Sequence, residues 1–214
     1  MTATSTQALP AALRANAPVA VLASTSPTRR RLLEQAGVAC SVEPPGIDEA
    51  AIKQALLNAE TAADDAALAL AEAKALAVSR RRPGWRVIGA DQLLACEGRW
   101  FDKPAGRDGA KAQLRALRGR THVLHSAVCA ARDGTIAWRH VERAHMTMRD
   151  CSDRYLDDYL NAAGAAVCQS VGAYQLEGLG AQLFERVEGD YFAILGLPLL
   201  PLLAYLRRDG ALPA

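Results

Sequence analysis

The sequence contains few aromatic residues and no cysteine pair suited to a disulfide framework or a zinc site. Aromatic residues occupy 5% of the 214 positions, whereas 50% of the positions are hydrophobic, mostly alanine and leucine. The five cysteines are odd in number and none are at C-x-x-C spacing, which argues against both kinds of site. This composition favours helices packed on a modest sheet, with reduced thiols as in a cytosolic protein.

The chain also lacks a targeting segment, a membrane span and a strong charge imbalance. Its N-terminus has neither the basic start nor the apolar run of a signal peptide. No apolar stretch reaches the ~18 residues that a membrane span requires. The formal net charge is +2, and no basic stripe is interleaved with aromatic residues. We therefore expect a cytoplasmic protein with neither a membrane nor a nucleic acid as partner.

Several motifs that define large enzyme classes are absent. The sequence contains no G-x-S-x-G, no G-x-x-x-x-G-K-[ST] and no G-x-G-x-x-G, which argues against a serine-hydrolase elbow, a P-loop and a dinucleotide-binding turn. His122 and His125 are three positions apart in a predicted strand, so their side chains face opposite sides and do not form a metal pair.

Strands and helices alternate along most of the chain, which predicts an α/β fold. A hairpin signal at Asp133-Gly134 separates two long predicted strands. Residues 18–208 are expected to form one domain between an N-terminal extension, 1–17, and a C-terminal tail, 209–214. The predicted strands cover 19–23, 40–43, 86–90, 122–131 and 135–148. The predicted helices cover 27–36, 50–58, 66–80, 109–117, 152–163 and 197–208, with loops at 101–106 and 172–180.

The first predicted loop gathers polar groups at the start of a helix. Ser26 and Pro27 form a helix-start signal, and Ser24 and Arg29 lie beside it. Free backbone N–H groups, hydroxyls and a guanidinium make a cradle for phosphate. An ordinary helix cap with exposed arginines explains the same residues equally well.

Other charged residues have both a functional and an ordinary explanation. The predicted strand 86–90 ends at Asp91, and a carboxylate at a strand end can hold Mg²⁺ or activate water. An ordinary loop carboxylate is the alternative. Glu49 at a helix start, Lys74 in an alanine-rich helix and Lys103 in a loop are each unremarkable when taken singly.

Taken together, these residues resemble the motifs of the Maf family. The segment 22–29 reads L-A-S-T-S-P-T-R and resembles the family's opening L-A-S-x-S-P-R-R. Further segments match in the family's order: I-D-E at 47–49, A-K-A at 73–75, G-A-D at 89–91, K-P at 103–104, L-R-G-R-T-H at 117–122, G-A-Y at 172–174, E-G-D-Y at 188–191 and G-L-P at 196–198. The resemblance covers about residues 19–206.

This resemblance implies an elongated, two-lobed α/β fold, with a mixed twisted sheet flanked by helices and a central cleft, often as a homodimer. It also implies hydrolysis of a nucleoside triphosphate to a monophosphate and pyrophosphate with a divalent metal, Mg²⁺ or Mn²⁺. Asp91 would accept the proton from water and, with Glu49, hold the metal. The groups that would neutralise the triphosphate are Ser24, Ser26, Arg29, Lys74 and Lys103.

Three departures from the motifs concern base specificity. Gln92 and Glu177 resemble the D-Q and E-G pattern of the subgroup that acts on 7-methyl-GTP. Arginine, threonine and glutamine at the three positions would indicate the dTTP and UTP subgroup, and Thr28 fits neither pattern fully. Asp102 replaces the usual glycine before Lys103.

Other functions stay open at this point. A dTTP and UTP pyrophosphatase of the same family is one alternative, and a pyrophosphatase for inosine or xanthosine triphosphates is another. A third is a nucleotide-binding regulator of cell division without turnover. The presence of Asp91, Lys74 and Lys103 favours an enzyme.

Overall fold

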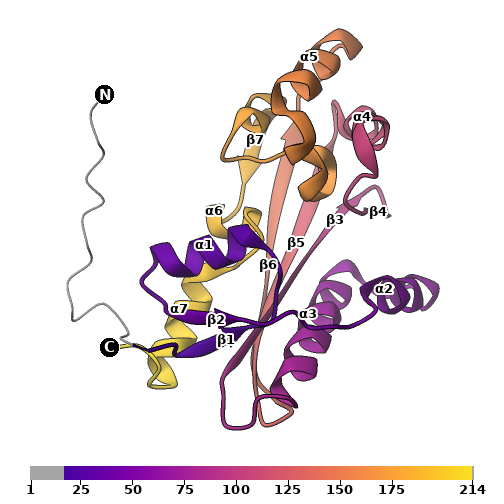
Figure 1. The fold of residues 1–214 in the computed structure, drawn as a ribbon. Coiled ribbons are helices and arrows are strands. Elements are labelled where there is room, and N and C mark those ends of the chain that lie inside the picture. The colour runs from indigo at the N-terminus through magenta and orange to yellow at the C-terminus, as the bar shows by residue number, and fades with distance from the viewer. Residues whose placement is uncertain (1–16, 214) are drawn as a thin grey trace, which may run out of the picture.

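A seven-stranded mixed sheet runs the length of the molecule (Figure 1). The structure is a computed structural model and describes residues 17–213, so nearly all of the predicted N-terminal extension lies outside the described residues. The strand order is β2-β1-β3-β5-β6-β7, with β4 paired to β3. The strands are β1 Ala20–Leu22, β2 Cys40–Val42, β3 Val87–Cys96, β4 Arg99–Phe101, β5 Thr121–Arg132, β6 Thr135–Met148 and β7 Phe184–Glu188. The predicted α/β class is confirmed.

The helices flank this sheet at both ends of the elongated molecule (Figure 1). The α-helices are α1 Pro27–Gln35, α2 Glu49–Asn58, α3 Ala63–Ser79, α4 Gly106–Leu117, α5 Asp153–Ala163, α6 Tyr191–Ile194 and α7 Leu199–Arg208. Within residues 17–213, the 3₁₀ segments are η2 Gly164–Gln169, η3 Val171–Ala173 and η4 Leu179–Leu183. Ser26 and Ser152 cap α1 and α5 as predicted. Among residues 17–213, none of the helices is long and apolar enough to cross a membrane.

The prediction that a strand ends at Asp91 is wrong, because β3 continues to Cys96. Leu93 and Leu94 are buried on opposite faces, which extends the strand beyond the polar pair Asp91-Gln92. Glu97 and Gly98, both at positive φ, then turn the chain into β4. The loop predicted at 101–106 is shorter, since Phe101 belongs to β4 and Gly106 begins α4. Helix α3 begins at Ala63, and the loop at 172–180 contains parts of η3 and η4.

The two faces of β3 carry different layers of the protein. Val87 and Leu93 pack with α3 in one apolar cluster. Ile88 packs with α1 and α7 on the opposite face, and Leu94 packs farther along that face with α4 and α5. Because successive side chains alternate between faces, Asp91 points to α3 and its neighbour Gln92 points to the other layer.

One edge of β3 is open along its middle. The parallel strand β1 pairs only with Val87 and Ile88, and the antiparallel β4 pairs only with Leu94–Cys96. Within the part of the chain that the structure describes, residues 89–93 therefore have no strand beside them on that edge. Asp91 and Gln92 lie in this gap, just beyond the carboxyl end of β1, where ligands bind in parallel sheets.

Gly89 allows α3 to approach β3 closely. A Cβ atom at this position would lie 2.2 Å from the Ala71 carbonyl oxygen and 2.8 Å from the Ala75 Cβ. Backbone cannot yield as a flexible side chain can, so α3 would have to move away from the strand. The same helix carries Lys74, whose position therefore depends on this contact.

We expect Gly89→Ala to lower the free energy of unfolding by about 1–3 kcal/mol, the usual cost of overpacking. Urea unfolding measures this difference. Gly109→Ala in α4 is the matched control, because its Cβ would lie 3.6 Å from the Pro104 side chain, which is an ordinary van der Waals contact. Equal stability of the two variants would contradict the proposed close packing at Gly89.

Candidate active site

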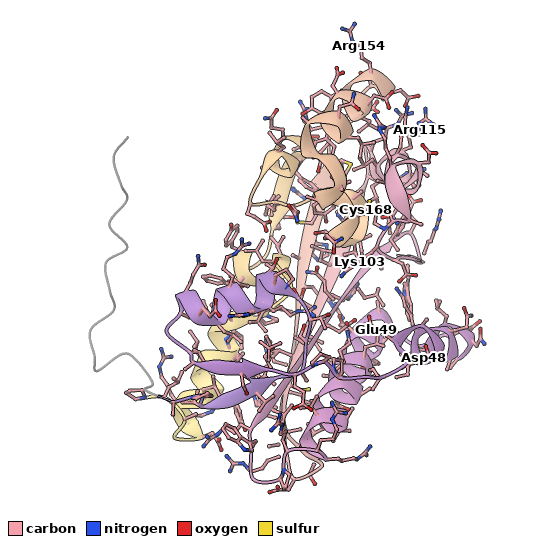
Figure 2. The ribbon with its side chains drawn as sticks, in the orientation of Figure 1. Asp48, Glu49, Lys103, Arg115, Arg154 and Cys168 are labelled. Carbon is pink, nitrogen blue, oxygen red and sulfur yellow. The ribbon has the colours of Figure 1, made fainter. Side chains whose placement is uncertain are left out.

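We call the end of the molecule with α4, α5, β4 and β7 the upper lobe, and the end with α1–α3, α7, β1 and β2 the lower lobe (Figure 1). A cleft of about 400 Å³ lies where the loop after β1, the start of α2 and the middle of β3 meet the loops of the upper lobe. Its size suits a small organic ligand. Figure 2 marks Glu49 and Lys103 on opposite sides of this cleft. All of the site residues predicted from the sequence line it: Ser24, Ser26, Thr28, Arg29, Glu49, Lys74, Asp91, Gln92, Lys103 and Glu177.

Lys74 forms a buried junction of charges at the floor of the cleft. Its Nζ lies 2.5 Å from Asp91 Oδ1 and 2.6 Å from Glu49 Oε2. Lys74 and Asp91 are buried, and the Glu49 side chain is about half exposed. One ammonium thus connects β3, α3 and the first turn of α2. The Lys74 ammonium contacts two carboxylates and is buried. The ordinary explanation, that a lysine in this helix extends its charge into bulk water, therefore does not apply.

Burial raises the pKa of the Asp91 carboxyl above its usual value. The positive charges of Lys74 and Arg29 oppose this shift, and the negative charge of Glu49 adds to it. A carboxylate with a raised pKa is a stronger proton acceptor than one in water. The position of Asp91 therefore suits a general base.

The loop after β1 forms the polar rim that the sequence indicated. Ser24 Oγ accepts hydrogen bonds from the Ser26 N–H at 3.2 Å and from Arg29 Nη1 at 3.3 Å. Ser26 Oγ accepts from the Arg29 N–H at 3.4 Å and caps α1. Arg29 Nε donates to the Gly196 carbonyl at 2.8 Å. The cap and the cradle are thus the same structure, with hydroxyls and a fixed guanidinium at a helix N-terminus, an arrangement that binds anions.

Gln92 has a fixed orientation on the opposite face of β3. Its Nε2 donates to Ser126 Oγ at 2.9 Å and to the Ala193 and Ile194 carbonyls, both at 3.0 Å. The amide nitrogen is thereby directed into the protein, and a Cβ built on Gly196 would lie 3.8 Å from Oε1. Gln92 lines the cleft, and these hydrogen bonds leave its Oε1 available as an acceptor.

Glu177 lies on a segment that three hydrogen bonds hold against the upper lobe. The Gly172 N–H donates to Gln113 Oε1 at 3.1 Å, and Tyr159 Oη donates to the Ala173 carbonyl at 3.2 Å. Tyr174 Oη lies 2.7 Å from His122 Nε2. The motif segments around His122 and Tyr174 thus meet beneath the loop that presents Glu177.

Sequence patterns did not single out Lys53, which also lines the cleft. Lys53 follows Glu49 by one helical turn, a spacing that places both on one face of α2. It forms an ion pair with Asp102. The Asp102 carbonyl accepts a hydrogen bond from Gln113 Nε2 at 2.7 Å, so Gln113 holds both this loop and the Gly172 segment. Helical spacing from Glu49 was the one signal that could have identified Lys53.

The carboxylates of the cleft fit a divalent cation that arrives together with a phosphate. Among residues 17–213, no group of three or more His, Cys, Asp or Glu side chains is arranged to hold a metal. Glu49 and Asp91 nevertheless converge on one point, the Lys74 ammonium. Mg²⁺ is commonly held by one or two carboxylates plus substrate phosphates. The donor set is therefore sufficient only if the ligand supplies oxygen atoms.

His122 makes the stability of the upper lobe dependent on pH. It is fully buried, its Nδ1 has no hydrogen-bond partner among the described residues, and burial lowers its pKa to about 4. The unfolded chain, with a histidine pKa near 6.5, binds more protons than the folded protein between these values, so stability falls as the pH is lowered.

We expect the free energy of unfolding to fall by about 2 kcal/mol because of His122 when the pH is lowered from 7 to 5. Urea unfolding at both pH values, on the wild type and on His122→Gln, isolates the effect. The variant should lose less stability than the wild type over this interval. The same loss in both proteins would show that His122 is not the group responsible.

Comparisons with known proteins agree with the Maf family motifs found in the sequence. The family model described as "Maf-like protein" matches residues 20–209. A protein of Paramagnetospirillum magneticum named "Nucleoside triphosphate pyrophosphatase" is 56% identical over 192 residues, covering 90% of this chain and 99% of the relative. One of the same name from Rhodospirillum rubrum is 51% identical, covering 91% and 96%. A "7-methyl-GTP pyrophosphatase" of Mesorhizobium japonicum is 50% identical, covering 90% and 96%.

Proposed function

The chain belongs to the Maf-like protein family, and from this membership we propose that it hydrolyses a nucleoside triphosphate to the monophosphate and pyrophosphate. The observation that carries the proposal is the Asp91–Lys74–Glu49 junction inside a cleft whose rim is built to bind anions. It combines a proton acceptor with the positive charge that a polyphosphate requires.

Asp91 would act as the general base in this reaction. It would take a proton from a water molecule whose oxygen attacks the α-phosphorus. The bond from that phosphorus to the bridging oxygen would break, and pyrophosphate would leave with the bonding electron pair. Lys74, which contacts Asp91 Oδ1, keeps the carboxyl in place, and Glu49 would orient the water or help to hold a metal.

The phosphate charges would be neutralised from two sides of the cleft. Arg29, with the Ser24 and Ser26 hydroxyls, would bind from the β1 side, and Lys103 would bind from the upper lobe. A Mg²⁺ or Mn²⁺ ion, held by Glu49, Asp91 and phosphate oxygens, would supply further positive charge to the leaving pyrophosphate.

Asp91→Asn should reduce kcat by about 10²–10⁴-fold, the usual contribution of a general base. The amide has nearly the same shape but cannot take the proton. Pyrophosphate release at saturating nucleotide measures the loss. Asp108→Asn, at an exposed position in α4, is the control and should keep full activity. Full activity of a folded Asp91→Asn protein would refute the assigned base.

We propose 7-methyl-GTP as the preferred substrate. The Glu177 carboxylate can accept hydrogen bonds from the N1–H and N2–H₂ groups of guanine. Methylation of N7 places positive charge on the ring, which a nearby carboxylate stabilises. Gln92 Oε1 adds a second acceptor to the same cleft. The relatives named for this substrate include proteins of Mesorhizobium japonicum and Brucella abortus, each 50% identical to the chain.

A panel of 7-methyl-GTP, dTTP, UTP and inosine triphosphate tests the substrate. We expect kcat/KM to be highest for 7-methyl-GTP, and Glu177→Gln to reduce this preference by about tenfold, the value of one charge-assisted hydrogen bond. Highest turnover of dTTP and UTP would keep the reaction and overturn the base assignment. Binding of nucleotides without any turnover would favour the regulator of cell division.

The proposal also includes the compartment in which the protein works and its role there. We propose that the protein works in the cytoplasm, where it would remove unusual nucleotides from the triphosphate pool. The expected homodimer stays a prediction, as does the absence of a nucleic-acid partner.

A further inference from the structure

Lys53 is a partly buried cation whose partner in the cleft is an exposed carboxylate. Its side chain is 15% exposed, whereas that of Asp102, with which it forms an ion pair, is 76% exposed. Both line the cleft. The partners come from different lobes, because Lys53 belongs to α2 and Asp102 follows β4.

The location of Lys53 connects two groups already assigned to the polyphosphate. Glu49, one helical turn earlier, contacts Lys74. Asp102, on the other side, directly precedes Lys103. Lys53 thus lines the same cleft as Lys74 and Lys103, one helical turn from a residue of the Lys74 junction and in contact with the residue before Lys103. A phosphate chain that contacted both Lys74 and Lys103 would come near it.

The Asp102 carboxylate does not suit a position beside a bound polyphosphate. It would repel phosphate, and exposed ion pairs contribute little stability. Gln113 holds the Asp102 backbone through the carbonyl, so the side chain can turn to water while the loop stays in place. A polyphosphate, which carries several charges and makes charge-assisted hydrogen bonds, is the stronger partner for Lys53.

The cleft contains equal numbers of positively and negatively charged side chains. Four cationic and four acidic side chains line it: Arg29, Lys53, Lys74 and Lys103, and Glu49, Asp91, Asp102 and Glu177. This balance leaves no surplus of positive charge for a triphosphate. Turning Asp102 out to water would create a surplus beside the phosphates.

We propose that Lys53 is a further polyphosphate-binding residue, and that Asp102 is the counter-ion it gives up when the nucleotide binds. This inference deepens the proposed function and rests on it for the substrate class. A plain structural clasp between the two lobes is the alternative. If the pair is a clasp, loss of either partner changes the affinity for polyphosphate in the same direction. If Asp102 is a displaced counter-ion, loss of Lys53 weakens polyphosphate binding and loss of Asp102 strengthens it.

The test is calorimetric binding of inorganic tripolyphosphate, with Mg²⁺ present, to the wild type, Lys53→Met, Lys53→Arg and Asp102→Asn. Lys53→Met should weaken binding by about tenfold, the value of one charge-assisted hydrogen bond. Lys53→Arg should restore most of the affinity. Asp102→Asn should bind more tightly than the wild type, because the competing charge is gone while the Gln113 contact remains.

Unchanged affinity in Lys53→Met would overturn the proposal, as would equal weakening by Lys53→Met and Asp102→Asn or no binding to the wild type. Nucleotide turnover by the wild type is measured separately. Lys53-dependent binding of tripolyphosphate without turnover of any nucleotide would refute the proposed function and leave this inference standing. Nucleotide turnover together with a tripolyphosphate affinity that does not depend on Lys53 would support the proposed function and refute this inference.

Discussion

The ammonium of Lys74, shared by Asp91 and Glu49, is the interaction on which the rest of the structure depends. Two carboxylates and one cation meet where α2, α3 and β3 converge, and two of the three groups are buried. Removing one partner of such a cluster leaves an uncompensated buried charge, whose cost commonly reaches about 3–5 kcal/mol. The contact exists only because Gly89 lets α3 lie against the strand. A backbone position without a side chain thus sets how closely Lys74 approaches Asp91, a contact on which the proposed chemistry would rely.

The cleft is a consequence of how the sheet is assembled. Strand β1 ends early and β4 begins late, so the middle of β3 is accessible from the side. The side chains that line the cleft come from both lobes, and in the upper lobe Gln113 joins two of the segments that carry them. This amide uses its oxygen for the Gly172 N–H and its nitrogen for the Asp102 carbonyl. The loops predicted to serve the base and the phosphates are therefore held by one residue.

Local patterns were sufficient for most of the fold, whereas the residues that line the cleft were named together only through the family resemblance. The caps at Ser26 and Ser152 and the hairpin at Asp133-Gly134 follow from side-chain chemistry that acts within a few residues. The end of β3 was misjudged, because a polar pair inside a strand has the same local appearance as a strand end. Strands β4 and β7 were missed because three to five residues form a strand only when a partner lies beside them. The Lys53–Asp102 pair depends on how the lobes meet, which no local pattern reports.

The alternation of side chains along β3 has an evolutionary consequence. Asp91 and Gln92 are adjacent in the gene, yet they belong to different layers, one with Lys74 and the other with Ser126 and α6. If Gln92 contributes to recognition of the base, as proposed, a codon change at position 92 would alter that recognition without removing a side chain of the Lys74 cluster. Base recognition and proton transfer would then be free to evolve separately in lineages that carry this scaffold.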